Sequence, residues 1–333
     1  MGERVGVYLK EWGFTNLSVY SFSTLGSLSS GKKYEREISV FVEREGEFLF
    51  AMTCFEYSDL LYIEKIDSTK SAEKCLYSSI VLAVVKCFNK RIHVFARAQP
   101  QLLFPESSNN PQKKILTERN LVRWWARTLS GATVKKGWYY VPGESSSSTK
   151  DIFTLLSSSS NGLNGADGSN GSNGTCKNET WEFGWPWKED QGVQVVPIFP
   201  DDPKYKCLLL LDEKSTIKDF ANMLQVTGEC GSGRFSGFFI LDPNPASTSS
   251  SFTDVSNEEY INFYKKLMYL DFSDAEKSKK SCQVLIELLK QMNITPRQIF
   301  KENVEATPLN FLEKKRVVEP VVLASNLIKR KKL

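Results

Sequence analysis

Short apolar and alternating runs fill the first 66 residues of the chain. Their lengths and their period of two are typical of strands that bury one face, and their close succession predicts an antiparallel meander. Gly46 is expected to turn the chain between two of these strands. The predicted elements are a helix over Val5 to Trp12 and strands over Leu17 to Phe22, Ile38 to Val42, Phe48 to Phe55 and Leu60 to Ile66.

Helical and strand patterns alternate over the next part of the chain. Asp67, Ser68 and Thr69 form a capping sequence for a helix over Ser71 to Phe88, and we expect Asp67 to be its N-cap. The pattern then predicts a strand over Arg91 to Arg97, a helix from Thr117 to Thr128, a strand over Val134 to Val141 and a short helix over Ile152 to Leu156.

The second half predicts further strands and helices. The elements are a buried strand over Val193 to Val196, a buried segment over Tyr205 to Leu211, a helix over Ile217 to Leu224, a strand over Arg234 to Leu241 and a helical region from Asn257 to Met292. The mixture of an antiparallel meander with alternating helices and strands indicates the α/β (α+β) class. We expect a central mixed β-sheet surrounded by helices, within a single domain over residues 1–333.

Two segments differ in composition from the rest. Residues 157–176 consist mainly of Ser, Asn and Gly and have little to bury, which predicts a flexible surface insertion. Residues 325–333 contain four consecutive basic residues, Lys329 to Lys332. This tail is typical either of a nuclear-import or acidic-partner segment or of a solvated end.

The composition narrows the class of protein. Apolar residues make up 41% and aromatic residues 12% of the 333 positions, which favours a globular fold. The net charge of +4 is too small to indicate a protein that coats DNA, so strong direct DNA binding is not expected. No apolar run reaches the ~18 residues that a membrane helix needs. The seven cysteines are scattered without a C-x-x-C pair, which favours a reducing compartment and argues against a metal site.

His93 is the only histidine in the chain. A catalytic centre of the Ser-His-Asp or Cys-His kind would have to use it, yet it lies within the apolar strand Ile92 to Phe95. We therefore expect a structural histidine within the sheet, with its ring nitrogens satisfied by hydrogen bonds.

Three motifs carry candidate chemistry. The sequence Pro197-Ile198-Phe199-Pro200-Asp201-Asp202-Pro203-Lys204 places two adjacent carboxylates between prolines, on a stiff turn at the end of a predicted strand. Solvated charges at a strand exit would explain it equally well. The other two motifs are Leu103-Phe104-Pro105-Glu106-Ser107 in a loop and the pair Trp124-Trp125 in a helix. The helical spacing of these tryptophans with Leu121 and Leu129 is also typical of an ordinary core stripe.

Together these motifs resemble the fungal histone H3 lysine acetyltransferases that depend on histone chaperones and share a fold with the CREB-binding-protein type acetyltransferases. Further matches are Lys65 to Thr69, Val141 to Glu144 and Asp271 to Asp274, in the family's order. The resemblance implies acetyl-CoA as co-substrate without a metal, the histone H3-H4 complex as substrate, and histone chaperones as activating partners. It also implies a nuclear protein with a role in chromatin, nucleosome assembly, the DNA damage response and transcription regulation.

The resemblance also implies roles for individual residues. It gives Asp201, Asp202, Trp125 and Asp67 as catalytic residues, Phe95 and Arg97 as cofactor-facing residues, and Lys204 as a site of autoacetylation. Lys113, Lys114 and Lys206 are candidate cationic contacts for the phosphates of coenzyme A. Gln99 and Trp124 complete the predicted cofactor-binding residues. A lysine substrate must lose a proton before it attacks, because its pKa is near ~10.4. We assign the carboxylates to positioning the cationic substrate, with proton abstraction as the alternative role. Cationic side chains are needed for the phosphates of coenzyme A. For Lys204 an ordinary ion pair is the alternative.

Two positions depart from the family pattern. Leu102 stands where relatives carry a tyrosine, and Lys114 where a histidine is usual. Both departures put in doubt a role that needs a hydroxyl or an imidazole there. They leave open a second hypothesis, in which the chain is a catalytically weak scaffold that binds histones or chaperones.

Overall fold

The computed structural model describes residues 1–26, 34–71, 75–157, 180–199, 203–228, 230, 233–244 and 252–300. Contacts divide the chain into residues 1–300 and residues 301–333, and the second unit lies outside the described residues. The predicted insertion over 157–176, apart from Ser157, and the basic tail over 325–333 also lie outside them. The extent of the predicted domain therefore stays a prediction.

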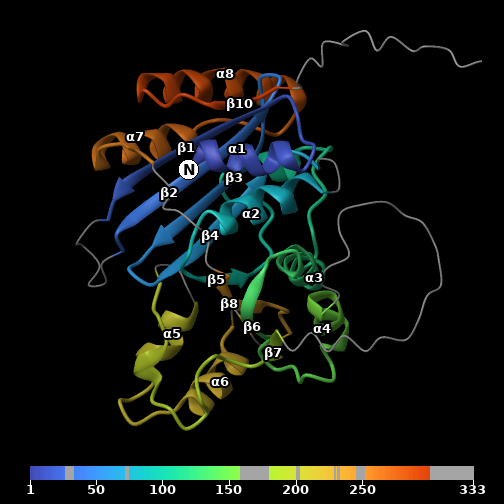
Figure 1. Cartoon of the computed structure of the whole chain (residues 1–333), viewed down its shortest axis with the longest axis vertical. Coiled ribbons are helices and arrows are strands. Elements are labelled where there is room, and N and C mark those ends of the chain that lie inside the picture. The colour runs from blue at the N-terminus through green and yellow to red at the C-terminus, as the bar shows by residue number, and fades with distance from the viewer. Residues whose placement is uncertain are drawn as a thin grey trace, which may run out of the picture. The chain divides into compact units, whose positions relative to one another are not determined.

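The described part of the first unit is built around a mixed sheet of ten strands (Figure 1). Its order is β10-β1-β2-β3-β4-β5-β8-β6-β7, and β9 pairs with β1. The first four strands form the predicted antiparallel meander, and β5 continues it in parallel with β4. The strands are β1 (Leu17–Leu25), β2 (Arg36–Arg44), β3 (Glu47–Glu56), β4 (Leu60–Ser68), β5 (Arg91–Ala96), β6 (Val134–Tyr140), β7 (Trp181–Phe183), β8 (Gly237–Pro243), β9 (Thr253–Asp254) and β10 (Arg297–Ile299).

The turn between β2 and β3 lies where Gly46 predicted it. Glu45 and Gly46 both have positive φ, at 54° and 84°. Two consecutive residues of this conformation form the tight hairpin turn whose twist matches that of the flanking strands. This turn sets the register of the meander, and that register decides which side chains face each side of the sheet.

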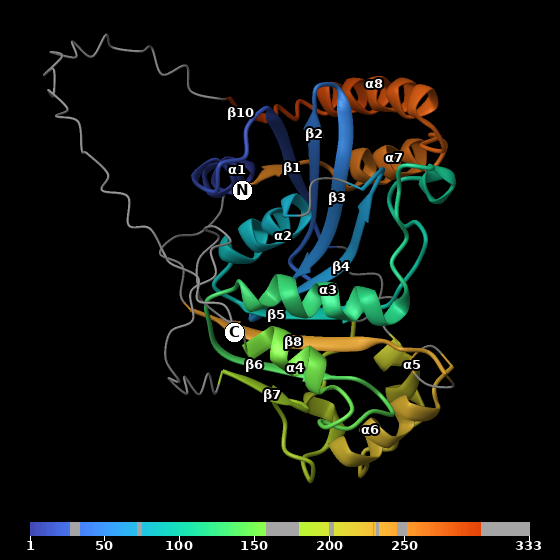
Figure 2. The ribbon, with the colours of Figure 1, turned by 90° about the vertical axis from the view of Figure 1, so that its right-hand side faces the viewer.

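Four helices cover one face of the sheet (Figure 2). They pack their apolar sides against alternate residues of the strands, such as Val40, Ile63 and Val94, in the largest core cluster. The sequence pattern explains this cluster, because residues two apart in a strand point to the same side. The helices are α1 (Gly2–Glu11), α2 (Leu76–Lys86), α3 (Glu118–Ser130) and α4 (Lys150–Ser157).

Two pairs of helices cover the opposite face. The helices α7 (Asn257–Leu267) and α8 (Ala275–Gln291) pack over β1 to β3, against residues such as Phe22 and Phe41. The helices α5 (Pro203–Leu209) and α6 (Ile217–Val226) pack near β6 and β8, against Tyr140 and Phe238. This arrangement confirms the predicted α/β class with a central mixed sheet flanked by helices (Figures 1 and 2).

Local capping residues explain where two of these helices begin. Thr216 accepts a hydrogen bond from the backbone N–H of Asp219, whose carboxylate accepts one in return from the backbone of Thr216. Ser256 and Glu259 form the same reciprocal pair at the start of α7. Such pairs satisfy N–H groups that a helix leaves without partners at its first turn.

The predicted strand over Val193 to Val196 is wrong. The chain forms a short 3-10 helix there, η3 (Val193–Val195). Val193 and Val196 are buried, whereas Gln194 is exposed and Val195 is 38% exposed. Apolar residues three apart fit one side of a helical turn, and three valines within four residues are too short a pattern to distinguish a buried strand from such a turn.

The predicted buried segment over Tyr205 to Leu211 is wrong in the same way. Most of it lies in α5, which has a buried and an exposed side. Leu209 and Leu210 are 66% and 72% exposed. An apolar run was therefore not a sufficient sign of burial at this position.

The predicted capping role of Asp67 is also wrong. Asp67 lies within β4, and α2 begins at Leu76 with Cys75 as its N-cap. The carboxylate of Asp67 instead accepts hydrogen bonds from a distant loop. A tertiary contact has thus replaced the local one that the Asp-Ser-Thr sequence suggested.

Candidate functional site

A cavity of about 360 Å³ opens beside α3. Its walls come from β3, the end of β4, the segment that leads from β5 to α3, and the first turns of α2 and α3. The lining residues are Phe50, Ile66, Asp67, Ser68, Ser71, Tyr77, Ala98, Gln99, Pro100, Lys113, Lys114, Ile115, Leu116, Leu121 and Trp124. Apolar side chains with a few polar groups are typical of a site for an organic ligand.

Asp67 and Lys113 form a buried ion pair in the wall of this cavity. Lys113 Nζ lies 2.7 Å from Asp67 Oδ1, and the two side chains are 7% and 5% exposed. Lys113 Nζ also donates to Ser107 Oγ at 2.8 Å. Asp67 Oδ2 accepts from the backbone N–H groups of Leu102, Leu103 and Phe104 at 2.7, 2.8 and 3.0 Å. The end of β4 therefore holds the loop at a fixed position.

The same loop is held from its other side by the segment between α7 and α8. The backbone N–H of Phe272 donates to the carbonyl of Pro105 at 3.0 Å. Asn110 Nδ2 donates to the carbonyl of Phe272 at 3.2 Å. The ring of Phe272 meets that of Phe104 edge-on, with ring centres 5.0 Å apart. Two of the motifs that carry the resemblance, far apart in the sequence, thus contact each other.

The two tryptophans of α3 face different surroundings. Trp124 lines the cavity, whereas Trp125 is 3% exposed and packs in the core. Their ring centres are 5.1 Å apart at an angle of 74°. The predicted apolar stripe is divided likewise, because Leu121 lines the cavity and Leu129 is fully buried. Trp125 supports the cavity wall from behind.

Lys114 and Gln99 lie at the open side of the cavity. Both are exposed, and the backbone N–H of Lys114 donates to Ser71 Oγ at 2.8 Å. With its amide oxygen directed at Arg97, Gln99 accepts hydrogen bonds from Arg97 Nη2 and, at 3.2 Å, from Arg97 Nε. Arg97 follows β5 and lies beside the rim without lining the cavity itself.

A second group of predicted residues gathers on the far side of the sheet from α3. Lys204 is 3% exposed, and its Nζ lies 4.9 Å from the ring centre of Phe238, 5.0 Å from that of Phe199 and 5.9 Å from that of Tyr62. Rings at this range stabilise a buried cation. The ring of Phe95 stacks on Phe238 at 4.7 Å. Phe95 and Lys204 thus meet at the same ring.

His93 lies next to this ring cluster. In the sheet it is directly opposite Tyr62 on β4 and Ile240 on β8, so the three side chains share one face. His93 is 3% exposed, and burial lowers its pKa well below the usual value, with the charges of Lys204 and Arg91 acting in the same direction. The imidazole is therefore neutral near pH 7.

The predicted placement of His93 within the sheet is confirmed, but its predicted hydrogen bonding is wrong at one nitrogen. Nε2 is buried and has no hydrogen-bond partner among the described residues. The rings of Phe199 and Trp187 lie against the imidazole, at 5.5 and 6.4 Å between ring centres. Aromatic neighbours explain the missing partner, because they offer no strong acceptor or donor.

The remaining predicted residues are distributed as follows. Lys206 is exposed on α5 and does not line the cavity. Asp201 and Asp202 lie outside the described residues, so their predicted roles stay predictions. The structure thus brings Asp67, Gln99, Lys113, Lys114 and Trp124 to one cavity.

Several lining residues were not predicted. Tyr77 and Phe50 form one wall, with ring centres 5.5 Å apart.

The ring cluster around Lys204 was not predicted either. It consists of Tyr62, Phe199 and Phe238. Strand alternation could have placed Tyr62 and His93 on one face, but only the paired register puts them side by side.

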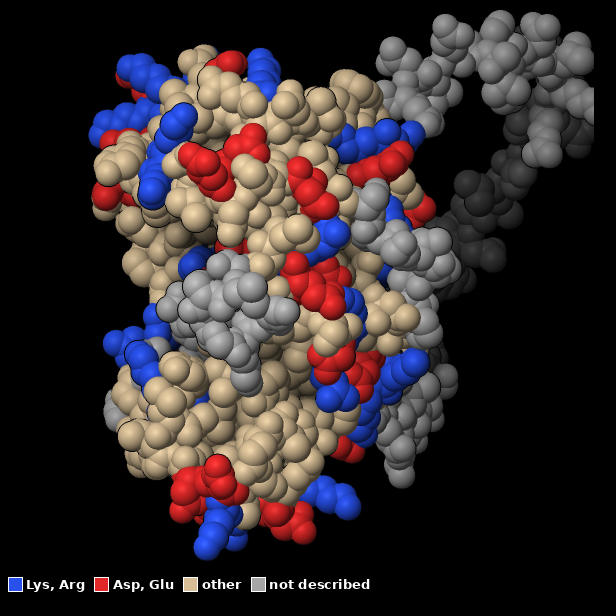
Figure 3. Space-filling view, turned by 90° about the vertical axis from the view of Figure 1, so that its left-hand side faces the viewer, with Lys and Arg blue, Asp and Glu red and all other residues tan. Residues whose placement is uncertain are grey.

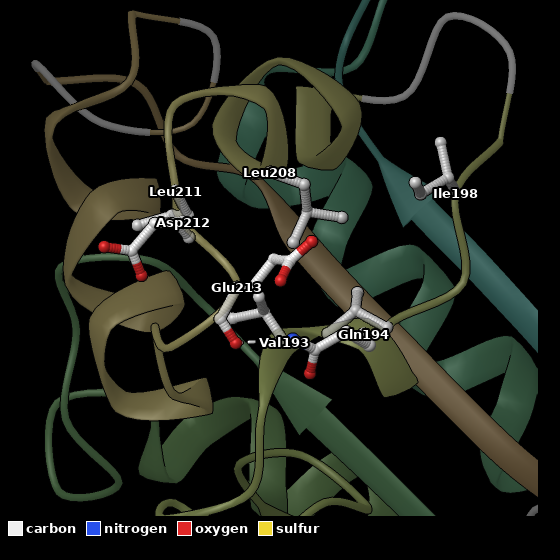
Figure 4. Close-up of a pocket in the computed structure, with 8 residues that line it drawn as sticks. Val193, Gln194, Ile198, Leu208, Leu211, Asp212 and Glu213 are labelled. Carbon is white, nitrogen blue, oxygen red and sulfur yellow. Dashed lines mark hydrogen bonds between the residues drawn. The ribbon is translucent and has the colours of Figure 1, made fainter.

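A smaller hollow of about 210 Å³ lies between η3 and α5 (Figure 4). Apolar side chains such as Val193, Ile198 and Leu208 line it, and the carboxylates of Asp212 and Glu213 lie at its border. The Pro197 to Lys204 motif contributes Ile198 to this hollow, so an apolar surface adjoins the motif.

Charge and metal-binding potential add two observations. On the face in Figure 3, lysines and arginines are interspersed with aspartates and glutamates. Within the described ranges, no three His, Cys, Asp or Glu side chains are grouped as they would be in a metal site. In the same ranges, none of the helices combines the length and the apolar character that crossing a bilayer requires.

Comparisons with known proteins agree with the sequence resemblance. The family model described as the histone acetyltransferase KAT11-type domain matches residues 32–307. Over 220 residues the chain is 31% identical to the histone acetyltransferase rtt109 of Schizosaccharomyces pombe, covering 60% of the chain and 58% of that protein. Over 204 residues it is 29% identical to the Candida albicans histone acetyltransferase RTT109, covering 57% of the chain and 50% of that protein. The chain thus spans about half the length of these relatives.

A solved structure supports the fold. The crystal structure of Rtt109 from Aspergillus fumigatus superimposes with a TM-score of 0.63 at 19% identity, covering 86% of this chain and 95% of that one. At this level of identity the likeness shows a shared fold. The predicted fold class is confirmed by this match and by the mixed sheet.

Proposed function

Because this chain belongs to the family of KAT11-type histone acetyltransferase domains, we propose that it moves the acetyl group of acetyl-CoA to lysine side chains of newly synthesised histone H3. Histone chaperones are its activating partners in this proposal. The relatives named as histone acetyltransferases support the reaction, and the resemblance of the motifs supports the choice of H3.

One observation supports this function most directly. Asp67, Gln99, Lys113, Lys114 and Trp124, which come from three separate segments, line a single cavity. Each of the five is a predicted contact for the substrate or the cofactor, so the cavity joins predicted contacts for both.

The cavity has the chemistry that acetyl-CoA requires. Leu121, Trp124 and Ile115 offer apolar walls for the pantetheine arm and the acetyl thioester. Lys114 is exposed at the open side, where it can meet a phosphate group of coenzyme A. The charge of Lys113 is balanced by Asp67 in the wall, so its contact with the cofactor stays a prediction. Arg97 beside the rim adds a second cation, and Lys206 stays a predicted contact.

The transfer balances as a simple acyl exchange. The substrate lysine loses a proton, its nitrogen forms a bond to the thioester carbon, and the bond from that carbon to sulfur breaks. The nitrogen then loses a second proton to give the amide, and coenzyme A, which leaves as a thiolate, takes up that proton. Asp201 and Asp202 position the cationic substrate in this proposal, and proton abstraction is their alternative role.

Lys204 is a proposed site of autoacetylation. Its ammonium group lies among three aromatic rings and is 3% exposed. Acetylation would replace a buried charge by a neutral amide, which lowers the cost of burial. The acetyl-CoA that the enzyme binds would supply the acetyl group.

The proposed setting is the nucleus, in nucleosome assembly, the DNA damage response and transcription regulation. The net charge of +4 and the mixed charges in Figure 3 support delivery of the histone by a chaperone over capture of DNA by this chain. The basic tail over 325–333 suits nuclear import.

A radiolabelled acetyl-transfer assay on the H3-H4 complex, with and without a histone chaperone, tests the proposed function. We expect transfer that the chaperone increases. Asp201→Asn combined with Asp202→Asn should abolish transfer while thermal stability stays close to that of the parent. If the chain binds histone and chaperone but transfers no acetyl group in either condition, the acetyltransferase hypothesis is wrong. The scaffold hypothesis, which the departures at Leu102 and Lys114 motivate, would then remain.

A further inference from the structure

A buried polar atom lies unused beside Lys204. His93 Nε2 is enclosed by the protein and has no hydrogen-bond partner among the described residues. Buried polar groups are almost always paired, because leaving one without a partner costs free energy. The site around His93 and the buried Lys204 would therefore be stabilised by an added polar group that pairs with Nε2.

The surroundings of His93 limit what that group can be. Tyr62 and Ile240 flank it within the sheet, while Phe199, Trp187 and Lys204 lie near it on the covered face. His93 and Lys204 share the ring of Phe199, with 5.5 Å between the ring centres of His93 and Phe199 and 5.0 Å from Lys204 Nζ to the Phe199 centre. Among these neighbours, Lys204 has the side chain that could carry a hydrogen-bonding group for His93.

An acetyl group on Lys204 would supply a hydrogen-bond acceptor in the neighbourhood of His93. The new C–N and C=O bonds, about 1.3 and 1.2 Å long, lengthen the side chain. The carbonyl oxygen that acetylation introduces is an acceptor without a partner of its own, and a neutral imidazole has one N–H to donate. Among aromatic rings, an unpaired carbonyl would be costly.

We propose that His93 is the hydrogen-bonding partner of acetylated Lys204, with Nε2–H donating to the acetyl carbonyl oxygen. This inference rests on the proposed autoacetylation and names the residue that holds its product. His93 is thereby a positioning residue for α5, which begins one residue before Lys204, and it does not take part in acetyl transfer. The neutral state that burial imposes on His93 suits a donor in an apolar site.

The test uses N-acetyllysine installed at position 204 during synthesis. This chain is compared with the unmodified chain, whose state at Lys204 is verified by mass spectrometry. The result therefore does not depend on whether the protein acetylates itself, so failure of the inference and failure of the proposed function are distinguishable. Because His93 is the only histidine, a ¹⁵N spectrum of protein with a histidine-free tag reports on this imidazole alone.

We expect acetylation at position 204 to shift the Nε2 resonance and to slow exchange of its proton with solvent. Acetyllysine at position 206, on the exposed side of the same helix, is the matched control and should leave the imidazole signals unchanged. Superimposable imidazole signals in the unmodified chain and the chain acetylated at 204 would overturn the inference.

A stability cycle gives a second readout. Thermal midpoints are measured for the parent, His93→Phe and His93→Gln, each with Lys204 unmodified or acetylated. Acetylation should raise the midpoint by about 2 °C more in the parent than in His93→Phe, which cannot donate. His93→Gln retains an N–H donor and should recover part of this difference. Equal effects of acetylation in the parent and in His93→Phe would contradict the proposed hydrogen bond.

Discussion

The ammonium group of Lys113 lies 2.7 Å from the carboxylate of Asp67, and the two side chains are 7% and 5% exposed. This pair joins the end of β4 to the loop that precedes α3, and both residues line the cavity. The same carboxylate also accepts from Leu102, Leu103 and Phe104. The shape of the cavity therefore depends on one carboxylate that is almost completely removed from water.

Asp67→Asn should destabilise the protein by about 3–5 kcal/mol, because it leaves the Lys113 charge buried without its partner. The new amide also directs an N–H₂ group toward donors that need acceptors. Urea denaturation measures the loss. Lys280→Met, which removes an exposed ion pair with Glu276, is the control and should cost less than about 0.5 kcal/mol. Similar losses for Asp67→Asn and Lys280→Met would show that the buried pair does not hold the loop.

Lys114→Glu should weaken acetyl-CoA binding by about tenfold, because it places a negative charge where a phosphate would lie. Lys114 is exposed, so the fold should be unaffected. The measurement is the KM for acetyl-CoA in a transfer assay, supported by calorimetric titration with coenzyme A. Lys280→Glu makes the same change of charge on α8, away from the cavity lining, and should leave KM within about twofold. Equal KM values for the two variants would place the phosphates elsewhere.

Gly137→Ala should destabilise the protein by about 1–3 kcal/mol. A Cβ atom at Gly137 would lie 2.5–2.8 Å from three ring atoms of Trp181, which is 3% exposed and pairs with Gly137 across β6 and β7. Either the ring or the strand must move. Thermal denaturation measures the effect, and Gly228→Ala is the control, since a Cβ there meets nothing within 4 Å. An unchanged midpoint for Gly137→Ala would mean that β7 is not held by this contact.

The sequence predicted the elements that depend on local periodicity and missed those that depend on tertiary contact. The meander and α3 follow from alternation and from helical spacing, so both were predicted close to their observed bounds. The chain forms a 3-10 helix over Val193 to Val195 where the sequence predicts a strand, because three valines within four residues are typical of a buried strand as well as of one helical turn.

The candidate site shows the same division. Trp124, Gln99 and Lys114 are predicted cofactor contacts, and the cavity contains all three. Tyr77 and Phe50 could not be predicted, because α2 and β3 bring them together from positions 27 residues apart in the sequence. Packing between elements, rather than any local pattern, creates that wall.

Cys75 should react with a maleimide at least about tenfold faster than Cys282 in the folded protein. Cys75 is exposed at the start of α2. Cys282 is 1% exposed, and burial raises the pKa of its thiol to about 11, so little thiolate is present near neutral pH. Peptide mapping by mass spectrometry after short labelling gives the two rates. Labelling in urea is the control and should bring the rates together, whereas equal rates in the native state would contradict the described core.

The stability of the protein should fall below about pH 6.5, and His93 should account for part of the fall. Burial lowers the pKa of His93 in the folded state well below its unfolded value, so the unfolded chain binds more protons in the window between the two. The contribution is complete above the unfolded pKa and is lost as the pH falls toward the folded pKa, by up to about 1.4 kcal/mol per pH unit. Urea denaturation of the parent and of His93→Phe at about pH 7.5 and about pH 5.5 measures it. The parent should lose more stability than the variant, because phenylalanine does not titrate, and parallel losses would show that His93 accepts a proton while folded.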